Sequence, residues 1–137
     1  MREVLDRLRP QLRTFRDEEG RELFDLPDAA RPRADAPAPP RLLPQHDNAV
    51  LSHADRRRYT PDTPIVVDPP VHGSVLHDGF LAGVWSLETA RRSTAIKVRH
   101  VGLSSTAVND VLAEAERVVR FLTPTSTSHE AFAVPIE

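Results

Sequence analysis

The segment 75–87 constrains the fold most, because it joins a two-residue turn signal to apolar runs on both sides. Asp78 and Gly79 form a dipeptide that favours a tight hairpin, since both residues tolerate the positive φ that such a turn requires. A further strand pattern follows, in which Ile96 and Val98 alternate with charged residues. These three strands in series predict an antiparallel meander.

The middle strand of this meander is apolar on both of its faces. One face carries Phe80, Ala82 and Val84, and the other carries Leu81, Trp85 and Leu87. Because successive side chains of a strand point to opposite faces, both faces are expected to be buried, as in a curled sheet or a small barrel. We assign Trp85 to the core and not to ligand stacking.

A helix is predicted after the meander, starting at Ser104 or Ser105 as N-cap and ending before Pro124. Its apolar positions follow the helical period: Val108, Val111, Leu112, Ala115, Val118, Val119 and Leu122. The serine- and threonine-rich residues 124–137 show no sustained period and are expected to form an irregular tail.

The N-terminal part predicts a second, smaller set of elements. Residues 2–9 have helical apolar spacing that Pro10 stops, and residues 11–26 have the pattern of a β-hairpin with Gly20 in its turn. The fold class expected is α+β, with this helix and wing-like hairpin preceding the sheet and its C-terminal helix. We divide the chain into residues 1–30, a connector, the β domain with its helix and the tail.

The proline-rich residues 31–44 are expected to be an extended connector, and the β domain to occupy 45–123. Within 41–58 the apolar stretch 49–51 favours a strand followed by a turn. Residues 65–67 form a short β-branched run between prolines, which is typical of an edge strand.

Composition excludes several function classes. The 137 residues suit one small domain, and the formal net charge of −2 argues against a uniformly basic DNA-binding body. There is no cysteine, so disulfides and thiolate chemistry are excluded. With no apolar run long enough to cross a bilayer, we expect a soluble cytoplasmic protein without membrane partners.

Residues that could carry chemistry are few. His46, Asp47, His53 and Asp55 are of metal-ligating types, but turn formation by Asp47 and ion pairing by Asp55 explain them better. Neither a nucleophile motif nor a glycine-rich phosphate loop is present. We therefore expect no catalytic residue, no metal and no cofactor, and we lean against an enzyme for this chain alone.

Arginine dominates the basic side chains, and two groups could reach phosphate oxygens. The first is the run Arg56, Arg57 and Arg58. The second lies near the first helix and hairpin and comprises Arg7, Arg9, Arg13 and Arg16. The alternative is a solvated surface of local ion pairs, because carboxylates interleave with the second group.

Three stretches together resemble winged-helix DNA-binding proteins related to the AlkZ and YcaQ DNA glycosylases. These stretches are RTFRDEEGRELFDLPDA, PAPPRLLPQHDNAVLSHADRRR and VLHDGFLAGVWSLE. Matching positions in the second block are Leu43, Pro44, Asp47, Asn48, Ser52, His53, Ala54, Asp55 and Arg56, and in the third Leu76, Asp78, Gly79, Gly83 and Trp85. The resemblance covers about residues 3 to 123.

The chain departs from the family pattern at His46, where an aromatic is usual, and over residues 59–72, which look shortened. It also lacks the glutamine-containing catalytic motif of the glycosylases, which Gln11 and Gln45 do not match. The resemblance implies a C-terminal portion that begins inside the last winged helix, with residues 2–9 as its final helix and 11–26 as its wing.

The resemblance implies a DNA-repair-related, non-catalytic module that holds duplex DNA by its backbone. The expected DNA contacts are Arg56, Arg57, Arg58, His53, Arg13 and Arg16. Two alternatives remain open: a part of a DNA glycosylase whose catalytic region is absent from this chain, and a structural module without DNA binding. In the last case a homo-oligomer, or packing on missing N-terminal winged-helix domains, is expected.

Overall fold

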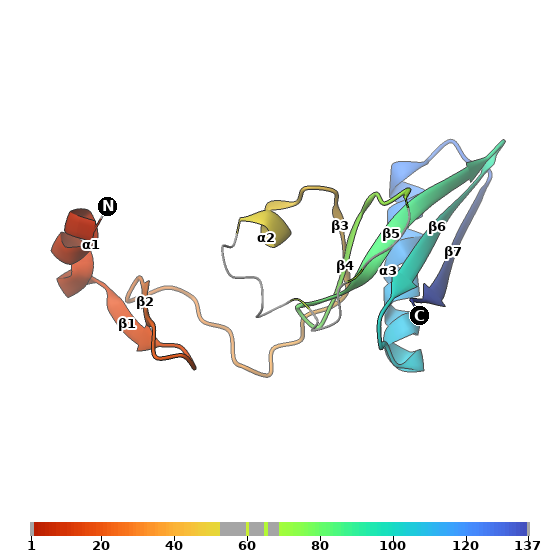
Figure 1. Ribbon diagram of the computed structural model, residues 1–137. Coiled ribbons are helices and arrows are strands. Elements are labelled where there is room, and N and C mark those ends of the chain that lie inside the picture. Colours follow the sequence, from red (N-terminus) through yellow and green to blue (C-terminus); the bar gives the residue numbers. More distant parts are fainter. Residues whose placement is uncertain (1, 53–59, 61–64, 66–68, 137) are drawn as a thin grey trace. The chain divides into compact units, whose positions relative to one another are not determined.

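The computed structural model describes residues 2–52, 60, 65 and 69–136 of the chain. Two compact units divide it, Met1–Ala36 and Pro37–Glu137 (Figure 1). Each unit has secondary structure of its own, and each is described by itself below. The mixed α+β class expected from the sequence is confirmed.

The N-terminal unit contains a short helix and a two-stranded hairpin. Helix α1 (Arg2–Leu8) runs into the 3₁₀ turn η1 (Arg9–Gln11), where Pro10 lies, and strands β1 (Arg13–Arg16) and β2 (Glu22–Asp25) pair antiparallel. Gly20 adopts a φ of 78° in the hairpin turn, as the sequence predicts. Among the described residues of this unit, not one is buried.

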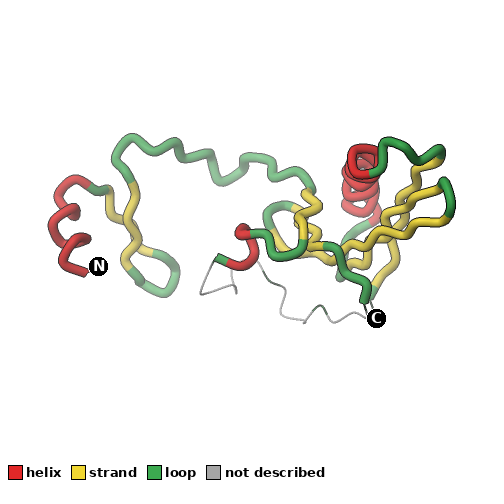
Figure 2. Tube along the Cα trace, turned by 90° about the horizontal axis from the view of Figure 1, so that it is seen from above, coloured by secondary structure: helices red, strands yellow, loops and turns green. Residues whose placement is uncertain are grey.

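The C-terminal unit is a five-stranded sheet with one long helix, α3 (Ser105–Leu122), along one face (Figure 2). Its strands, in their order across the sheet, are β3 (Arg41–Pro44), β4 (Gly73–His77), β5 (Phe80–Ala90), β6 (Ser93–His100) and β7 (Ser128–Pro135). The first four pair antiparallel, whereas β7 is parallel to β6. The sheet is open, so the alternative of a small barrel is wrong. The expected antiparallel pairing is present from β3 to β6, and β7 adds one parallel strand.

The core lies between α3 and the sheet. Its fully enclosed side chains, each with 0% exposure, are Val75, Ile96, Val98, Val111, Ala115 and Val119. Ser104 caps α3, since its hydroxyl accepts a hydrogen bond from the Ala107 backbone N–H, and the predicted helix is confirmed. Burial also alternates along β6 as predicted, with Ile96 and Val98 inward.

The hairpin predicted at Asp78 and Gly79 is present, with φ values of 51° and 79°. A register shift between Val75 and Leu76 places an extra residue, Ala82, in β5. This bulge disturbs the strict alternation on which the burial of both faces was predicted. Phe80, the first residue of β5 after the turn, is 56% exposed, so its assignment to a buried face is wrong.

The tail is not irregular, because Ser128–Pro135 forms strand β7. Strands β6 and β7 are joined through α3, so the parallel pair needs the whole helix as its connection. Ala131 and Ala133 pack on the core from one side of β7, while Phe132 lies on the other side and is 37% exposed. Apolar residues on both faces conceal the period of two in the sequence.

Two expectations for residues 41–58 also change. The strand lies at Arg41–Pro44, inside the expected connector, and the stretch 49–51 belongs to one helical turn, α2 (Asn48–Leu51). Prolines at the ends of β3 are tolerated because β3 is an edge strand. The predicted strand at 65–67 lies outside the described residues except for Ile65, which has no regular structure.

Candidate functional site

The two hairpin arginines singled out by the sequence lie on opposite faces of β1. Arg13 is opposite Asp25 and Arg16 is opposite Glu22 in the antiparallel register. They are three positions apart, and side chains alternate along a strand, so they do not share a face. One flat ligand surface therefore cannot contact both side chains from the same side of the hairpin.

The face that carries Arg13 contains an arginine–aromatic cluster. The guanidinium carbons of Arg13 and Arg31 lie 5.3 Å and 5.4 Å from the centroid of the Phe15 ring. Arg31 also pairs with Asp25 at 3.2 Å, which leaves Arg13 without an ion pair among the described residues. Arg13 is thus a cation that an anionic ligand could reach without displacing a protein carboxylate.

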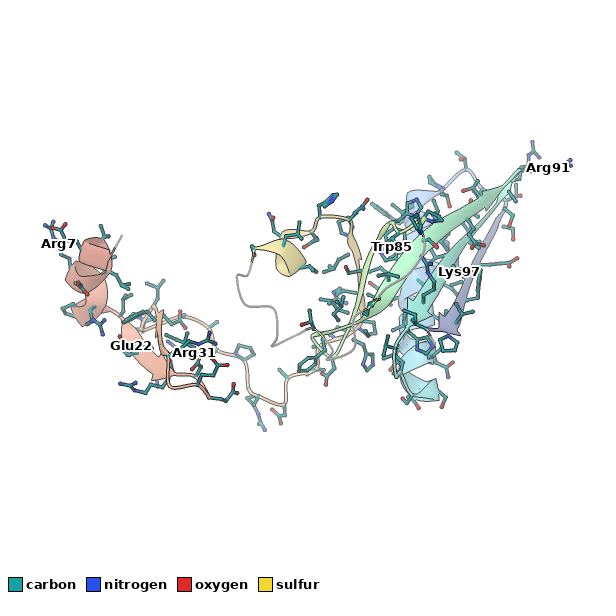
Figure 3. All side chains as sticks on the ribbon, in the orientation of Figure 1. Arg7, Glu22, Arg31, Trp85, Arg91 and Lys97 are labelled. Atoms are coloured by element: carbon teal, nitrogen blue, oxygen red, sulfur yellow. The ribbon has the colours of Figure 1, made fainter. Side chains whose placement is uncertain are left out.

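Arg31 holds the segment that follows the hairpin. Its guanidinium donates to the carbonyl of Leu26 at 2.6 Å, to that of Pro27 at 3.2 Å and to that of Ala29 at 3.1 Å. The planar fork of arginine suits several acceptors at once, which a lysine could not match. One side chain, labelled in Figure 3, therefore contacts three backbone carbonyls between residues 26 and 29.

The opposite face of the hairpin is closed by local contacts. Arg16 donates to the carbonyl of Gly20 at 3.0 Å, and Arg9 pairs with Glu22 at 2.5 Å while lying 4.8 Å from the Phe24 ring centroid. The hydrogen bond to Glu22 raises the pKa of Arg9 above its ordinary value. On this face Arg9 fits the local ion-pair alternative, whereas Arg16 is bound to a backbone carbonyl.

Asp17 organises the hairpin turn. Its carboxylate accepts hydrogen bonds from the Arg21 side chain at 2.7 Å, from the Arg21 backbone at 2.8 Å and from the Glu19 backbone at 3.0 Å. The hydrogen bond from the Arg21 side chain is the main cause that lowers the pKa of Asp17. The hairpin turn therefore prefers the ionised carboxylate.

In the second block of the resemblance, Asp47 has a structural role. Its carboxylate accepts the Ala49 backbone N–H at 2.8 Å and so caps α2, which confirms the turn-forming interpretation. His53, Arg56, Arg57 and Arg58 lie outside the described residues. Within the described part of the chain, no three histidine, aspartate or glutamate side chains are grouped so that they could hold a metal ion.

The third block positions Trp85 in the core beside the first edge strand. The indole Nε1 donates to the carbonyl of Leu43 at 2.9 Å, and the side chain is only 7% exposed. Gly73 makes this approach feasible, because a Cβ there would lie 1.8 Å from the Leu43 carbonyl oxygen and 2.6 Å from Trp85 Nε1. The expected core role of Trp85 is confirmed.

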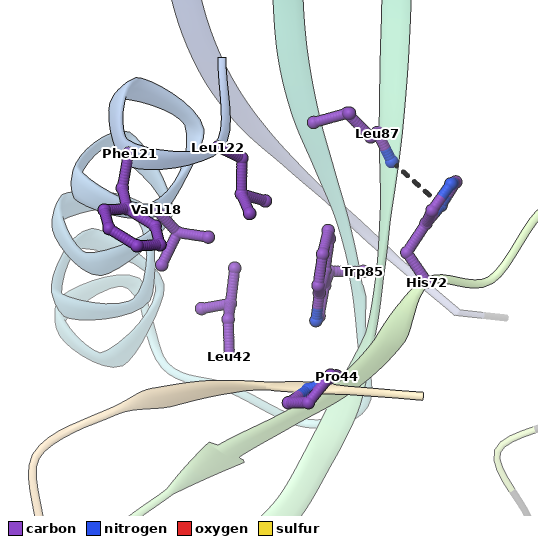
Figure 4. Close-up of a pocket in the computed structure, with 8 residues that line it drawn as sticks. All are labelled: Leu42, Pro44, His72, Trp85, Leu87, Val118, Phe121 and Leu122. Carbon is purple, nitrogen blue, oxygen red and sulfur yellow. Dashed lines mark hydrogen bonds between the residues drawn. The ribbon is translucent and has the colours of Figure 1, made fainter. Parts of the chain in front are cut away.

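A pocket of about 560 Å³ opens beside Trp85, at the C-terminal end of α3 (Figure 4). Its lining comes from β3, β5 and α3 and includes Leu42, Pro44, Leu87, Val118, Phe121 and Leu122. His72 is the one titratable residue of this lining. Its ring stacks on Trp85 with 5.8 Å between the ring centroids, and its Nδ1 accepts a hydrogen bond from the Leu87 backbone N–H at 3.1 Å. Because Nδ1 of this imidazole is already hydrogen-bonded and the other lining residues have no titratable group, the pocket offers no acid–base pair.

Sequence reasoning missed one exposed cationic feature, Arg91 and Arg92, which form the turn between β5 and β6. The signal was present, because A-R-R-S separates two strand patterns and therefore marks the tip of a hairpin. Both side chains are exposed, and neither makes an ion pair with any residue in the described ranges.

Comparison with known families assigns the chain to a class of DNA repair proteins. The family model for DNA glycosylase AlkZ-like proteins matches residues 1–121. The chain therefore belongs to the AlkZ-like DNA glycosylase family. No curated protein and no solved structure matches the chain. None of the described helices is long and apolar enough to cross a membrane.

Proposed function

We propose that this chain binds duplex DNA as a non-catalytic module, with arginine side chains on the phosphate backbone. The observation that carries the proposal is the AlkZ-like match over residues 1–121. In this proposal residues 2–26 act as the helix and wing of a winged helix, and the sheet with α3 is the accompanying β-rich domain. Backbone contacts position a protein on DNA without reading its sequence.

The proposed DNA contacts are Arg13 on the hairpin and the run Arg56, Arg57 and Arg58 with His53. Arg13 is favoured by its geometry, because the only polar or ring contact of its side chain among the described residues is with Phe15. Arg16 ranks behind it, since it lies on the other face and already donates to Gly20. A guanidinium that stacks on an aromatic ring keeps its donors available for phosphate oxygens.

The test is a fluorescence-anisotropy titration of short labelled duplexes with the intact chain and with Arg56→Ala/Arg57→Ala/Arg58→Ala. We expect the triple variant to bind duplexes of different sequence more weakly by a similar factor. Its log–log salt slope should be smaller by roughly 2.7, at about 0.9 per lost phosphate contact. Unchanged affinity in the triple variant would sink the assignment of these three residues.

A second candidate, an interaction module without DNA binding, is favoured by the exposed apolar side chains of the N-terminal unit. Val4 is 59% exposed, Leu8 43% and Leu26 65%, in a unit that buries none of its described residues. Size-exclusion chromatography with light scattering distinguishes the two candidates. A stable oligomer with no DNA affinity at low salt would favour the second.

A further inference from the structure

The tip of the β5–β6 hairpin carries two cations that the fold does not use. Arg91 and Arg92 are exposed, and neither side chain makes a hydrogen bond, an ion pair or a ring contact with any residue of the described ranges. Other described cations of this unit are engaged: Arg120 pairs with Glu116 at 3.3 Å and Lys97 with Glu88 at 3.9 Å. Arg91 extends beyond the ends of the strands (Figure 3).

The backbone at this tip is in an unfavourable conformation for an arginine. Arg91 has a φ of 48°, in the left-handed region that glycine or asparagine adopts most readily. A residue held in such a conformation costs free energy that the surrounding structure must offset. The position therefore combines a conformational cost with a side chain that makes no hydrogen bond, ion pair or ring contact with the described residues.

The turn is also hydrogen-bonded to the segment that precedes β7. The Arg92 carbonyl accepts hydrogen bonds from the backbone N–H of Thr127 at 2.8 Å and from its hydroxyl at 3.2 Å. Beside this contact, the hydroxyls of Thr94 and Ser126 are 2.7 Å apart. The turn is thus tied to the segment that leads into β7, and its cations start from a fixed backbone, which lowers the entropy lost on binding.

The polar surroundings of the tip suit a phosphodiester. Ser93 and Ser128 lie opposite each other on β6 and β7, and Ser93 directly follows the turn, so two hydroxyl-bearing residues lie at this end of the sheet. Of the nearby carboxylates, Glu88 pairs with Lys97, and Glu130 lies opposite Ala95, farther from the turn. Paired guanidinium groups with hydroxyl donors match the oxygens of a phosphate group.

We propose that Arg91 and Arg92 form a phosphodiester-binding tip that contacts the backbone of duplex DNA, separate from the hairpin arginines of the N-terminal unit. The inference rests on the proposed DNA binding and extends it to a site in the C-terminal unit. Because neither side chain supports the fold, their removal affects binding and leaves stability in place.

The test compares Arg91→Ala/Arg92→Ala with a control that loses the same charge from the same unit, Arg117→Ala/Arg120→Ala. Both control arginines pair with glutamates on α3. In anisotropy titrations between 50 and 200 mM salt, the tip variant should lose about 1.8 from the log–log slope and bind about tenfold more weakly at low salt. The control should keep the slope of the unmodified chain.

The outcomes separate the two proposals. If the unmodified chain binds DNA and the tip variant keeps its salt slope, the tip assignment is overturned while DNA binding stands. If the control variant loses as much of the salt slope as the tip variant, the tip assignment is overturned as well. If the unmodified chain does not bind, both are overturned. Arg91→Gly adds a readout that a structural role would not give, namely weaker binding with a melting temperature at or above that of the unmodified chain.

Discussion

Different interactions stabilise the N-terminal unit and the C-terminal unit of this chain. In the N-terminal unit the described residues include none that are buried, and the hairpin depends on contacts of Arg9, Arg21 and Arg31 with carboxylates, carbonyls and aromatic rings. In the C-terminal unit, valine and isoleucine side chains with 0% exposure pack between α3 and the sheet. The first unit should therefore respond to salt and acid, and the second to the loss of apolar volume.

The largest expected effect comes from the core of the C-terminal unit. Ile96→Ala removes a side chain with 0% exposure and leaves a cavity, which should lower the free energy of unfolding by about 2–5 kcal/mol. Urea denaturation followed by the fluorescence of Trp85, the one tryptophan, measures it. Val4→Ala, at a residue 59% exposed, is the control and should leave this transition in place. Equal effects would contradict the contrast between the units.

A smaller effect is expected where β3 meets β4. In Gly73→Ala the new Cβ would lie 1.8 Å from the Leu43 carbonyl oxygen, so the strands must separate and the Trp85–Leu43 hydrogen bond must lengthen. We expect a loss of about 1–3 kcal/mol and a red shift of tryptophan emission. Ser74→Ala, one position along, should change neither, and a variant at Gly73 with native emission would contradict the close approach.

In the N-terminal unit, Arg31→Ala should weaken the hairpin by about 1 kcal/mol, because its contacts are polar and partly solvated. Amide hydrogen exchange of residues 13–25 is expected to accelerate, while exchange in β6 and α3 stays the same. Arg33→Ala is the matched control, since Arg33 is exposed and its side chain pairs with Asp35 alone among the described residues. Accelerated exchange in both units would show that they do not respond separately.

The smallest effect concerns pH. The hydrogen bond from Arg21 lowers the pKa of Asp17 below its ordinary value, so the folded hairpin favours the carboxylate. This contribution is present above the unfolded pKa and is lost as the pH falls through the lowered folded value. Asp17→Asn should therefore weaken the hairpin at neutral pH and flatten its acid response below about pH 4, as amide chemical shifts would report.

For that titration Asp28→Asn is the control with the same change in charge. It should leave the acid response of the hairpin as in the unmodified chain. A hairpin that responds to acid identically with and without the Asp17 carboxylate would contradict the assigned role of this residue.

Local signals explain what could be predicted from the sequence. The Asp78-Gly79 turn and the Ser104 cap depend on a few adjacent residues, so both were found. Strand β7 was missed because its parallel pairing with β6 is set by a connection through all of α3 and its apolar residues lie on both faces. Strand β3 was hidden by its prolines, which only an edge position tolerates.

The candidate site was predictable to a lesser degree. The arginine content of the sequence indicated phosphate contacts. The strand register is needed to show that Arg13 and Arg16 occupy opposite faces, and the ion pair of Asp25 with Arg31 leaves Arg13 without that carboxylate as a partner. Arg91 and Arg92 were overlooked because two arginines in a turn look like ordinary surface. The structure shows that Lys97 and Arg120 pair with glutamates, whereas the side chains of Arg91 and Arg92 have no partner among the described residues. The sequence does not show this difference.

The salt dependence of duplex binding by the intact chain tests the central claim most directly. With Arg13, the run Arg56–Arg58 and the Arg91–Arg92 tip each on phosphates, six contacts predict that affinity falls roughly 10³-fold between 50 and 200 mM salt, similarly for duplexes of different sequence. Absence of binding at 50 mM, or binding that does not change with salt, would contradict the account.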